Sequence, residues 1–297
     1  MRVGVTVPMA LGEVTDGRMT TFAQTADFAG RAEGLGLDSI WVFDHLLWRL
    51  KGDPDEGPNE AWTILSALAP VVPRVELGAL VMCSSFRNAG LMAKMSATLD
   101  EVSGGRLIVG LGCGWHKPEY DAFGLPFDHL VGRFEEDLEV IARLLRGETV
   151  DLAGRWSRYE RAVLLPPPVR RPPILVASKG ERMLRLTAQW ADAWNTAWFG
   201  RVDDMLRERL RSLDDAVDTA GRDAGSMRRT VGLRLNEPGE GVGGDDRATD
   251  AEAAGLADLF DELEGIGFAD AIIWATAKTP AALERIAEAR TLHLAHR

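Results

Sequence analysis

The sequence predicts one α/β domain, a (β/α)₈ TIM barrel that spans residues 1–297 and carries insertions in its strand-to-helix loops. Eight short apolar runs alternate with helix-length amphipathic stretches, the pattern of repeated strand–helix units that close a parallel sheet. The chain has 297 residues, of which 46% are hydrophobic, and this size is usual for a single barrel. No internal repeat indicates another architecture.

A strand is predicted at each of the eight apolar runs. These lie near residues 3–7, 39–42, 76–82, 107–111, 174–177, 193–195, 231–235 and 271–274. Capping patterns mark three of the helices that follow them: Thr21 with Gln24, Ser178 with Glu181, and Thr279 before Pro280.

Three segments do not fit a minimal barrel. Segment 47–59 is rich in Gly, Pro and acidic residues, and segment 149–173 contains the runs PPP and PP, so both are predicted to lie outside the barrel. Segment 237–250 is rich in Gly and Asp and is predicted to be mobile. After the fourth strand, a loop is predicted up to a helix that begins near Arg133.

Composition limits the class of partner. The formal net charge of −11 disfavours nucleic acids and anionic membranes, because both attract basic surfaces. The two cysteines, Cys83 and Cys113, provide no disulfide framework, which favours a reducing compartment and hence the cytoplasm. No apolar run reaches the roughly 18 residues of a membrane span. The first residues, MRVGVTVPMALGEV, are broken by glycine and proline and indicate a strand rather than a signal peptide.

The active site of such a barrel is expected where the strands end and the next loops begin. The run WVFDHLLW after the second strand places Asp44, His45 and Trp48 at that end. A histidine beside a carboxylate is a candidate proton donor, worth about 10² to 10⁴ in rate when it is positioned. The alternative is a structural Asp–His pair that binds loop backbone, and the residues alone favour neither interpretation.

Glycines gather at the end of the fourth strand, in GLGCGWHKPEY. Gly110, Gly112 and Gly114 permit the close approach of a planar ligand or of another backbone, because glycine has no Cβ. The dinucleotide-binding motif is not matched, since Trp115 and a predicted loop follow where a helix should open. Close packing within the protein is an equal alternative.

The fifth strand leads into ILVASKGERML. The free N–H groups of the helix start, the Ser178 hydroxyl and the Lys179 ammonium form a candidate anion site. The alternative is an ordinary capping box with Lys179 in solvent. Arg201, in NTAWFGR after the sixth strand, is a second cation for the same anion or a solvated residue, and taken alone it favours the latter.

Metal chemistry is not predicted. None of the five histidines stands at i, i+4 with a carboxylate, and the two cysteines lie 30 residues apart. Neither a G-x-S-x-G elbow nor a Walker lysine loop is present. The remaining expectation is an organic cofactor.

Four segments carry a family resemblance: WVFDHLL; AWTILSALA followed by RVELGALVMCSSFRN; AKMSATLDEVSGGRLIVGLGCGWHKPEYDAFGLPF; and PPILVASKGERMLRLTAQWADAWN. By their order and spacing, the chain resembles the bacterial luciferase-like superfamily and is most similar to its coenzyme F420-dependent oxidoreductases. The resemblance covers nearly the whole chain. It is less specific for the flavin, so FMN is the alternative cofactor.

The resemblance implies roles for particular residues. It places His45 beside the deazaflavin ring, where it handles the proton that accompanies hydride transfer, with Asp44 supporting it. It implies a non-prolyl cis peptide between Leu80 and Val81 that buttresses the ring. Phosphate contacts are implied for residues 176–180. The full implied cofactor-binding set is Asp44, His45, Leu80, Val81, Cys83, Gly112, Cys113, Gly114, Val176, Ala177, Ser178, Lys179, Gly180 and Arg201.

Two departures from the family pattern bear on the substrate. Some sugar-phosphate enzymes of the superfamily have an acidic residue where this chain has Trp115, which disfavours a similar substrate or a carboxylate acid at that position. Many relatives read GGSG or GGxG where this chain has ASKG, a bulkier and cationic loop, and Lys179 then favours an anionic cofactor tail.

The implied function is hydride transfer between the deazaflavin C5 and a small organic substrate, with His45 as the catalytic residue. A substrate wall is expected from Trp48, Trp115, His116 and Trp198, which suits a flat or hydrophobic acceptor such as an enone or imine. The alternatives are an FMN-dependent monooxygenase, a catalytically idle cofactor-binding barrel and, last, a metal-dependent isomerase or lyase. A homodimer is also expected, because GLMAKMSATL offers Leu91, Met95 and Leu99, although these side chains have packing on the barrel as an alternative.

Overall fold

Eight parallel strand positions form a closed barrel in the computed structural model, which describes residues 1–14, 17–52, 54–239 and 247–296. The strands are β1 (Arg2–Thr6), β2 (Ser39–Val42), β3 (Glu76–Ala79), β5 (Leu107–Gly112), β8 (Ile174–Ala177), β9 (Ala193–Phe199), β10 (Arg228–Leu235) and β12 (Asp270–Ala275). Neighbouring strands pair in this order, and β12 pairs with β1 to complete the circle. All eight predicted strands, and the predicted fold, are confirmed.

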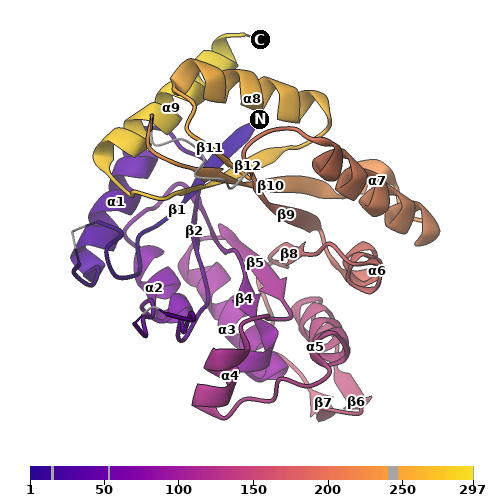
Figure 1. The fold of residues 1–297 in the computed structure, drawn as a ribbon. Coiled ribbons are helices and arrows are strands. Elements are labelled where there is room, and N and C mark those ends of the chain that lie inside the picture. The colour runs from indigo at the N-terminus through magenta and orange to yellow at the C-terminus, as the bar shows by residue number, and fades with distance from the viewer. Residues whose placement is uncertain (15–16, 53, 240–246, 297) are drawn as a thin grey trace.

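Helices form an outer ring around these strands (Figure 1). They are α1 (Phe22–Gly34), α2 (Ala61–Leu68), α3 (Ala89–Val102), α5 (Leu130–Leu145), α6 (Glu181–Trp190), α7 (Asp204–Thr219), α8 (Ala253–Gly265) and α9 (Pro280–Ala295). Two short 3₁₀ turns, η1 (Ser84–Phe86) and η2 (Ala224–Ser226), lie between them. The apolar stripe of each helix packs on the outside of the strands, where the main core lies.

Two of the three predicted helix caps are confirmed and one is wrong. Thr21 caps α1 in a capping box, and Thr279 caps α9. The residue before α6 is Gly180 rather than Ser178, so the capping box with Glu181 does not form. Ser178 lies too far before the helix to cap it, and its hydroxyl instead lies 2.8 Å from Thr187 Oγ1.

The third barrel strand is interrupted. β3 ends at Ala79, and a two-residue strand β4 (Met82–Cys83) continues the pairing with β5. The peptide between Leu80 and Val81 is cis, as expected. The glycines of β5 allow this close packing, because a Cβ at Gly110 would lie 1.8 Å from the Ala79 carbonyl oxygen. The packing interpretation of that glycine is therefore supported.

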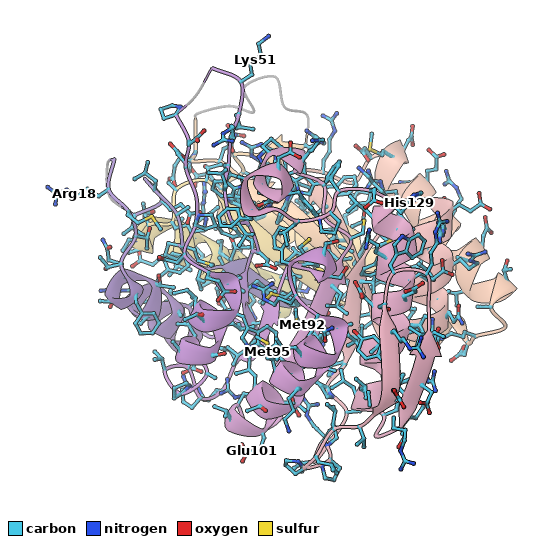
Figure 2. All side chains as sticks on the ribbon, turned by 90° about the horizontal axis from the view of Figure 1, so that it is seen from below. Arg18, Lys51, Met92, Met95, Glu101 and His129 are labelled. Carbon is cyan, nitrogen blue, oxygen red and sulfur yellow. The ribbon has the colours of Figure 1, made fainter. Side chains whose placement is uncertain are left out.

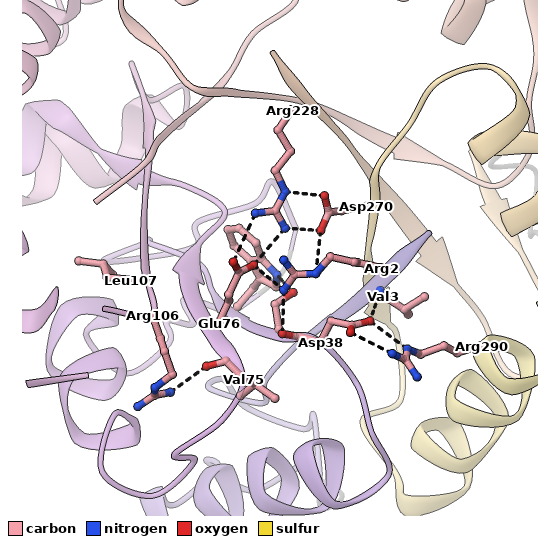
Figure 3. A network of polar contacts seen from close by, with 12 residues as sticks. Arg2, Val3, Asp38, Val75, Glu76, Arg106, Leu107, Arg228, Asp270 and Arg290 are labelled. Atoms are coloured by element: carbon pink, nitrogen blue, oxygen red, sulfur yellow. Dashed lines mark hydrogen bonds and ion pairs between the residues drawn. The ribbon is translucent and has the colours of Figure 1, made fainter. Parts of the chain in front are cut away.

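Charged side chains close the end of the barrel where its strands begin. The Arg228 guanidinium binds both Asp270 and Glu76, and Arg2 lies 2.7 Å from Glu76. Figure 3 shows these groups converging at the first residues of four strands. Burial opposes the charge of Arg228, but the two carboxylates outweigh that effect and raise its pKa. This end of a barrel contributes to stability rather than to catalysis.

The two segments predicted to lie outside the barrel contribute no barrel strand among their described residues. Segment 47–59 contains no helix among its described residues and is tied by an isolated bridge between Trp48 and Glu56. Segment 149–173 leaves the barrel as the antiparallel hairpin of β6 (Val150–Ala153) and β7 (Arg158–Ala162). In Figure 2 the loop with Lys51 lies at one end of the molecule, and Glu101 at the end of α3 lies at the other.

The helix expected near Arg133 is corrected, and the expectation for segment 237–250 concerns residues that the structure describes only in part. The helix expected near Arg133 begins earlier, at Leu130, and a short helix α4 (Lys117–Phe123) precedes it. This helix was missed because Pro118 indicated a loop, although proline also fits the first turn of a helix. Of segment 237–250, residues 240–246 lie outside the described residues, and β11 (Ala248–Thr249) pairs with β10.

The α3 residues expected at a dimer interface divide between two environments. Leu99 is buried against the barrel, Met95 is half-buried and Leu91 is 53% exposed. Packing on the barrel therefore accounts for part of this stripe, and the homodimer stays a prediction. Across the described ranges, no helix is long and apolar enough to cross a membrane.

Candidate active site

A cavity of about 690 Å³ opens at the carboxyl ends of the barrel strands. Most of the residues expected from the sequence line it: Asp44, His45, Leu80, Val81, Cys83, Gly112, Cys113, Gly114, Ala177, Ser178, Lys179 and Gly180, together with Trp48, Trp115 and Trp198. A larger hollow of about 970 Å³ runs between α6 and α7 on the outside of the barrel. The cavity at the strand ends is the candidate active site, because the titratable and aromatic side chains converge there.

Three expected residues do not line the cavity. Val176 is buried within β8. His116 is also buried, and its Nε2 accepts a hydrogen bond from the Arg49 backbone N–H at 3.2 Å, so it fixes the preceding loop instead of forming the substrate wall. Arg201 is exposed and lies outside the lining, because β9 continues to Phe199 and carries the following residues past the mouth.

His45 is paired with a carboxylate from a distant part of the chain. Its Nδ1 lies 3.2 and 3.3 Å from the two carboxylate oxygens of Glu119, which is 1% exposed in the first turn of α4. Glu119 also accepts a hydrogen bond from the Leu46 backbone N–H at 2.9 Å, so its position is fixed. A carboxylate at Nδ1 places the proton of a neutral imidazole on that nitrogen. Nε2, which has no partner among the described residues, then remains available to a bound substrate.

Asp44 does not bind His45, which corrects the expectation that it supports that residue. Its carboxylate accepts hydrogen bonds from Arg87 at 2.6 and 3.0 Å and from the Cys83 backbone N–H at 2.9 Å. Burial opposes the charge of Arg87, but its hydrogen bonds with Asp44 and Glu60 outweigh that effect and raise its pKa. Asp44 therefore holds the segment after the cis peptide in place.

The cysteine of this segment is a neutral thiol. Burial raises the pKa of Cys83 to about 12, and its Sγ lies 3.0 Å from the Tyr120 hydroxyl. Burial also raises the pKa of Tyr120. Neither group is charged near neutral pH, so the Cys83 thiol presents no charge of its own to the cavity.

Aromatic side chains form a continuous wall on the other side. The Phe43 ring stacks between Trp48 and Trp274, with ring centroids 5.5 and 5.3 Å away, and Trp198 meets Trp274 edge to face at 5.2 Å. We call these four residues the aromatic wall. Trp115 is 66% exposed at the mouth, and its ring lies 5.6 Å from the imidazole of His45.

Three polar groups of the cavity were not identified from the sequence. Glu119 was hidden by the interpretation of its helix as a loop. Arg209 reaches the cavity from α7, where its guanidinium donates to Thr196 Oγ1 at 2.8 Å, and burial lowers its pKa. Asn195 lies in a predicted strand, but only the fold shows that its side chain lines the cavity. Among the described residues, no group of three or more His, Cys, Asp or Glu is placed to hold a metal ion.

Comparison with known proteins identifies the family of this chain. The family model described as luciferase-like monooxygenase matches residues 1–235. The phthiodiolone/phenolphthiodiolone dimycocerosates ketoreductase of Mycobacterium tuberculosis (strain H37Rv) is 36% identical over 214 residues, which cover 65% of this chain and 55% of that protein. This chain thus spans about half the length of that ketoreductase.

A second relative matches over a larger share of its own length. The F420-dependent glucose-6-phosphate dehydrogenase of Kineococcus radiotolerans is 30% identical over 235 residues, which cover 77% of this chain and 68% of that protein. The coenzyme F420-dependent tetrahydromethanopterin reductase of Methanopyrus kandleri shares the fold, with a TM-score of 0.77 and 17% identity over 96% of this chain and 97% of that one. The chain therefore belongs to the luciferase-like monooxygenase family.

Proposed function

We propose that this chain is an F420-dependent oxidoreductase that acts on a small organic substrate. The observation that carries the proposal is the pairing of His45 with Glu119 at the cavity, which leaves one imidazole nitrogen available to a substrate. The name of the Kineococcus relative, which specifies F420, supports the choice of cofactor.

The cavity residues fit a flat heterocycle with one polar edge. Asn195 Nδ2 donates to Thr230 Oγ1 at 2.8 Å, and Thr230 in turn donates to the Trp194 carbonyl, which fixes the orientation of the amide. Asn195 Oδ1 has no hydrogen-bond partner within the described part of the chain. It is an acceptor for a ring N–H, whereas the apolar side chains of Leu80 and Val81 suit the ring face.

The anionic tail of the cofactor would lie over the loop after β8. Lys179 makes no ion pair with a described residue, and the N–H groups at the start of α6 carry the positive end of the helix dipole. Arg209 adds a second cation to the lining. The two cations proposed to bind the tail are therefore Lys179 and Arg209, in place of the Lys179 and Arg201 expected from the sequence.

When bound, reduced F420 supplies a hydride from ring carbon C5. The protein supplies and removes the accompanying proton at His45 Nε2. Glu119 holds the imidazole through Nδ1 and stabilises its doubly protonated form, because a carboxylate at about 3 Å favours positive charge. The aromatic wall and Trp115 cover the reacting atoms and reduce access of water.

The second candidate is an FMN-dependent monooxygenase. The description of the matching family names a monooxygenase, and an apolar cavity that limits access of water suits oxygen chemistry as well as hydride transfer. The third is a barrel that binds a cofactor without turnover.

Fluorescence titration of the purified protein with oxidised F420 and, separately, with FMN distinguishes the first two candidates. Low-micromolar binding of F420 with negligible binding of FMN is the expected result. Preference for FMN would replace the proposal by the monooxygenase. Binding of neither would contradict both.

A single-turnover assay, in which the protein with bound reduced F420 reduces an organic acceptor such as an enone, then tests the role of His45. The variant His45→Asn should bind F420 as the wild type does but lose about 10²-fold or more in rate. His129→Asn is the matched control, because His129 is exposed in a left-handed backbone conformation that asparagine tolerates. Equal rates for the two variants would exclude His45 as the proton carrier.

A further inference from the structure

We propose that a second hollow, of about 320 Å³, binds a small organic ammonium ion with Asp137 as its counter-ion. The hollow lies between η1, α5 and the β6–β7 hairpin, and it shares no lining residue with the candidate active site. The proposal is independent of the proposed function.

Asp137 is a carboxylate that lacks a counter-ion. It projects from α5 into the hollow, is half-buried, and makes no ion pair with any described residue. Burial raises the pKa of this carboxyl to about 7, and the nearby charge of Glu136 adds to the shift. The charge of Arg133, one helical turn earlier, acts against this shift without forming an ion pair, so the site has room for a further positive charge.

Ser84 provides a second indication of a ligand. It is 3% exposed and lines the same hollow, and its Oγ makes no hydrogen bond of normal geometry. The hydroxyl lies close enough to Asp137 to lower the pKa of that carboxyl. An ammonium group has three N–H donors, and the oxygens of Asp137 and Ser84 are acceptors for them. Asn88 Oδ1 already accepts a hydrogen bond from the Leu91 N–H at 3.0 Å and has one further lone pair to offer.

Two arginines also line the hollow, but each is already neutralised. Arg87 pairs with both Asp44 and Glu60, and Arg133 pairs with Asp128 at 2.8 Å. Carboxylates therefore outnumber arginines around the hollow, and the local charge favours a cation over an anion.

The lining also indicates the rest of the ligand. Phe86, Trp156 and Tyr159 surround the hollow, so methylene groups attached to the ammonium would pack on aromatic rings. Trp156 already attracts cations, since the guanidinium carbons of Arg155 and Arg133 lie 5.0 and 5.9 Å from its ring. Within the described residues, no third carboxylate, histidine or cysteine completes a metal site here. The expected ligand is a short alkylammonium.

Calorimetric titration with n-butylammonium chloride tests this site in the whole protein. Saturable binding by the wild type is expected, with no binding of the uncharged analogue n-butanol. Asp137→Asn should weaken binding by about tenfold to a hundredfold, because it removes a charge-assisted hydrogen bond while keeping the shape. Asp121→Asn is the matched control, since Asp121 pairs with Lys117 on the surface of α4.

Lowering the pH from 8 to 6 should also weaken binding, because protons compete for Asp137. The other charged or titratable groups on the elements around it are Glu136 and Arg133 from α5, Tyr159 from β7, Arg87 after η1, and His129 at the start of α5, whose ring lies 5.6 Å from that of Trp156. Repeating the pH series in His129→Asn separates any contribution of this imidazole from that of Asp137. A pH-independent affinity would therefore contradict the assignment of Asp137.

A lysine side chain from a second copy of the chain is the other source of an ammonium group. In that case Asp137→Asn lowers the molecular mass in solution, and n-butylammonium competes with the association. Equal affinity of the wild type for butylammonium and butanol, or equal affinity of the two aspartate variants for butylammonium, would overturn the proposal. The proposal would also be overturned if the wild type did not bind butylammonium and Asp137→Asn had the same molecular mass in solution as the wild type.

Discussion

Lys278 and Glu13 form an ion pair in which the lysine side chain is completely buried. The same ammonium group lies 5.1 Å from the Trp274 ring and 5.8 Å from the Phe43 ring. Glu13 also accepts hydrogen bonds from the backbone N–H groups of Met9 and Ala10. The pair thus joins the loop after β1 to the loop after β12, directly behind the aromatic wall.

Removing one member of this pair should be costly. Lys278→Met leaves the Glu13 carboxylate buried without its cation, and the free energy of unfolding should fall by about 3 to 5 kcal/mol in denaturant titration. The double variant with Glu13→Gln should recover part of that loss, because no buried charge is left unpaired. Lys117→Met in the exposed pair with Asp121 should cost no more than about 1 kcal/mol. If Lys278→Met and Lys117→Met lost the same free energy of unfolding, burial would not explain the contribution of the Lys278–Glu13 pair to stability.

Glu119 is expected to act through His45. Glu119→Gln keeps the size of the side chain but removes the charge that stabilises the doubly protonated imidazole, so kcat should fall about tenfold to a hundredfold. The affinity for F420 should change by less than about threefold, because the affected proton is not needed for cofactor binding. The second variant His45→Asn/Glu119→Gln should be no slower than His45→Asn alone. Additive losses of rate would assign Glu119 a separate role.

The strands were predictable because both of their faces are buried, one toward the helices and the other toward the barrel interior, so each apolar run stands out in the sequence. The Thr21 and Thr279 caps were also predictable, since a cap depends on residues within one helical turn. Ser178 has the same local spacing and still does not cap α6, because its hydroxyl pairs with the Thr187 side chain farther along that helix.

The partner of His45 was not predictable from adjacent residues. Asp44 precedes it in the chain, but consecutive residues in extended backbone point to opposite sides, and Asp44 points to Arg87. The true partner, Glu119, lies 74 residues away and meets His45 only when α4 folds over the barrel mouth. Arg209 depends on tertiary structure in the same way, because nothing in the sequence of α7 distinguishes it from the other arginines of that helix.

Gly112 is expected to control the shape of the ring site. A Cβ at this position would lie 2.5 Å from Val81 Cγ2, so Gly112→Ala must displace the segment that contains the cis peptide. The dissociation constant for F420 should rise at least about tenfold, measured by fluorescence titration, since one such displacement costs more than about 1.4 kcal/mol. Gly30→Ala is the matched control, because a Cβ there meets no atom within 4 Å. Unchanged affinity in Gly112→Ala would place the ring elsewhere in the cavity.

Asp137 is expected to reduce stability at neutral and alkaline pH when no ligand is bound. Burial raises the pKa of its carboxyl from 3.8 to about 7, so the folded state holds a proton that the unfolded state has already released. Stability from this group is therefore complete below about pH 4 and is lost as the pH rises through about 7. Asp137→Asn avoids that loss of stability. At pH 8 its free energy of unfolding should exceed that of the wild type by about 1 to 3 kcal/mol. Near pH 4 the free energies of unfolding of the two proteins should converge. A difference between the variants that stays constant from pH 4 to pH 8 would show that the carboxyl titrates normally. Adding n-butylammonium at pH 8 should narrow the gap, because the ligand binds the wild type more tightly and therefore stabilises it more.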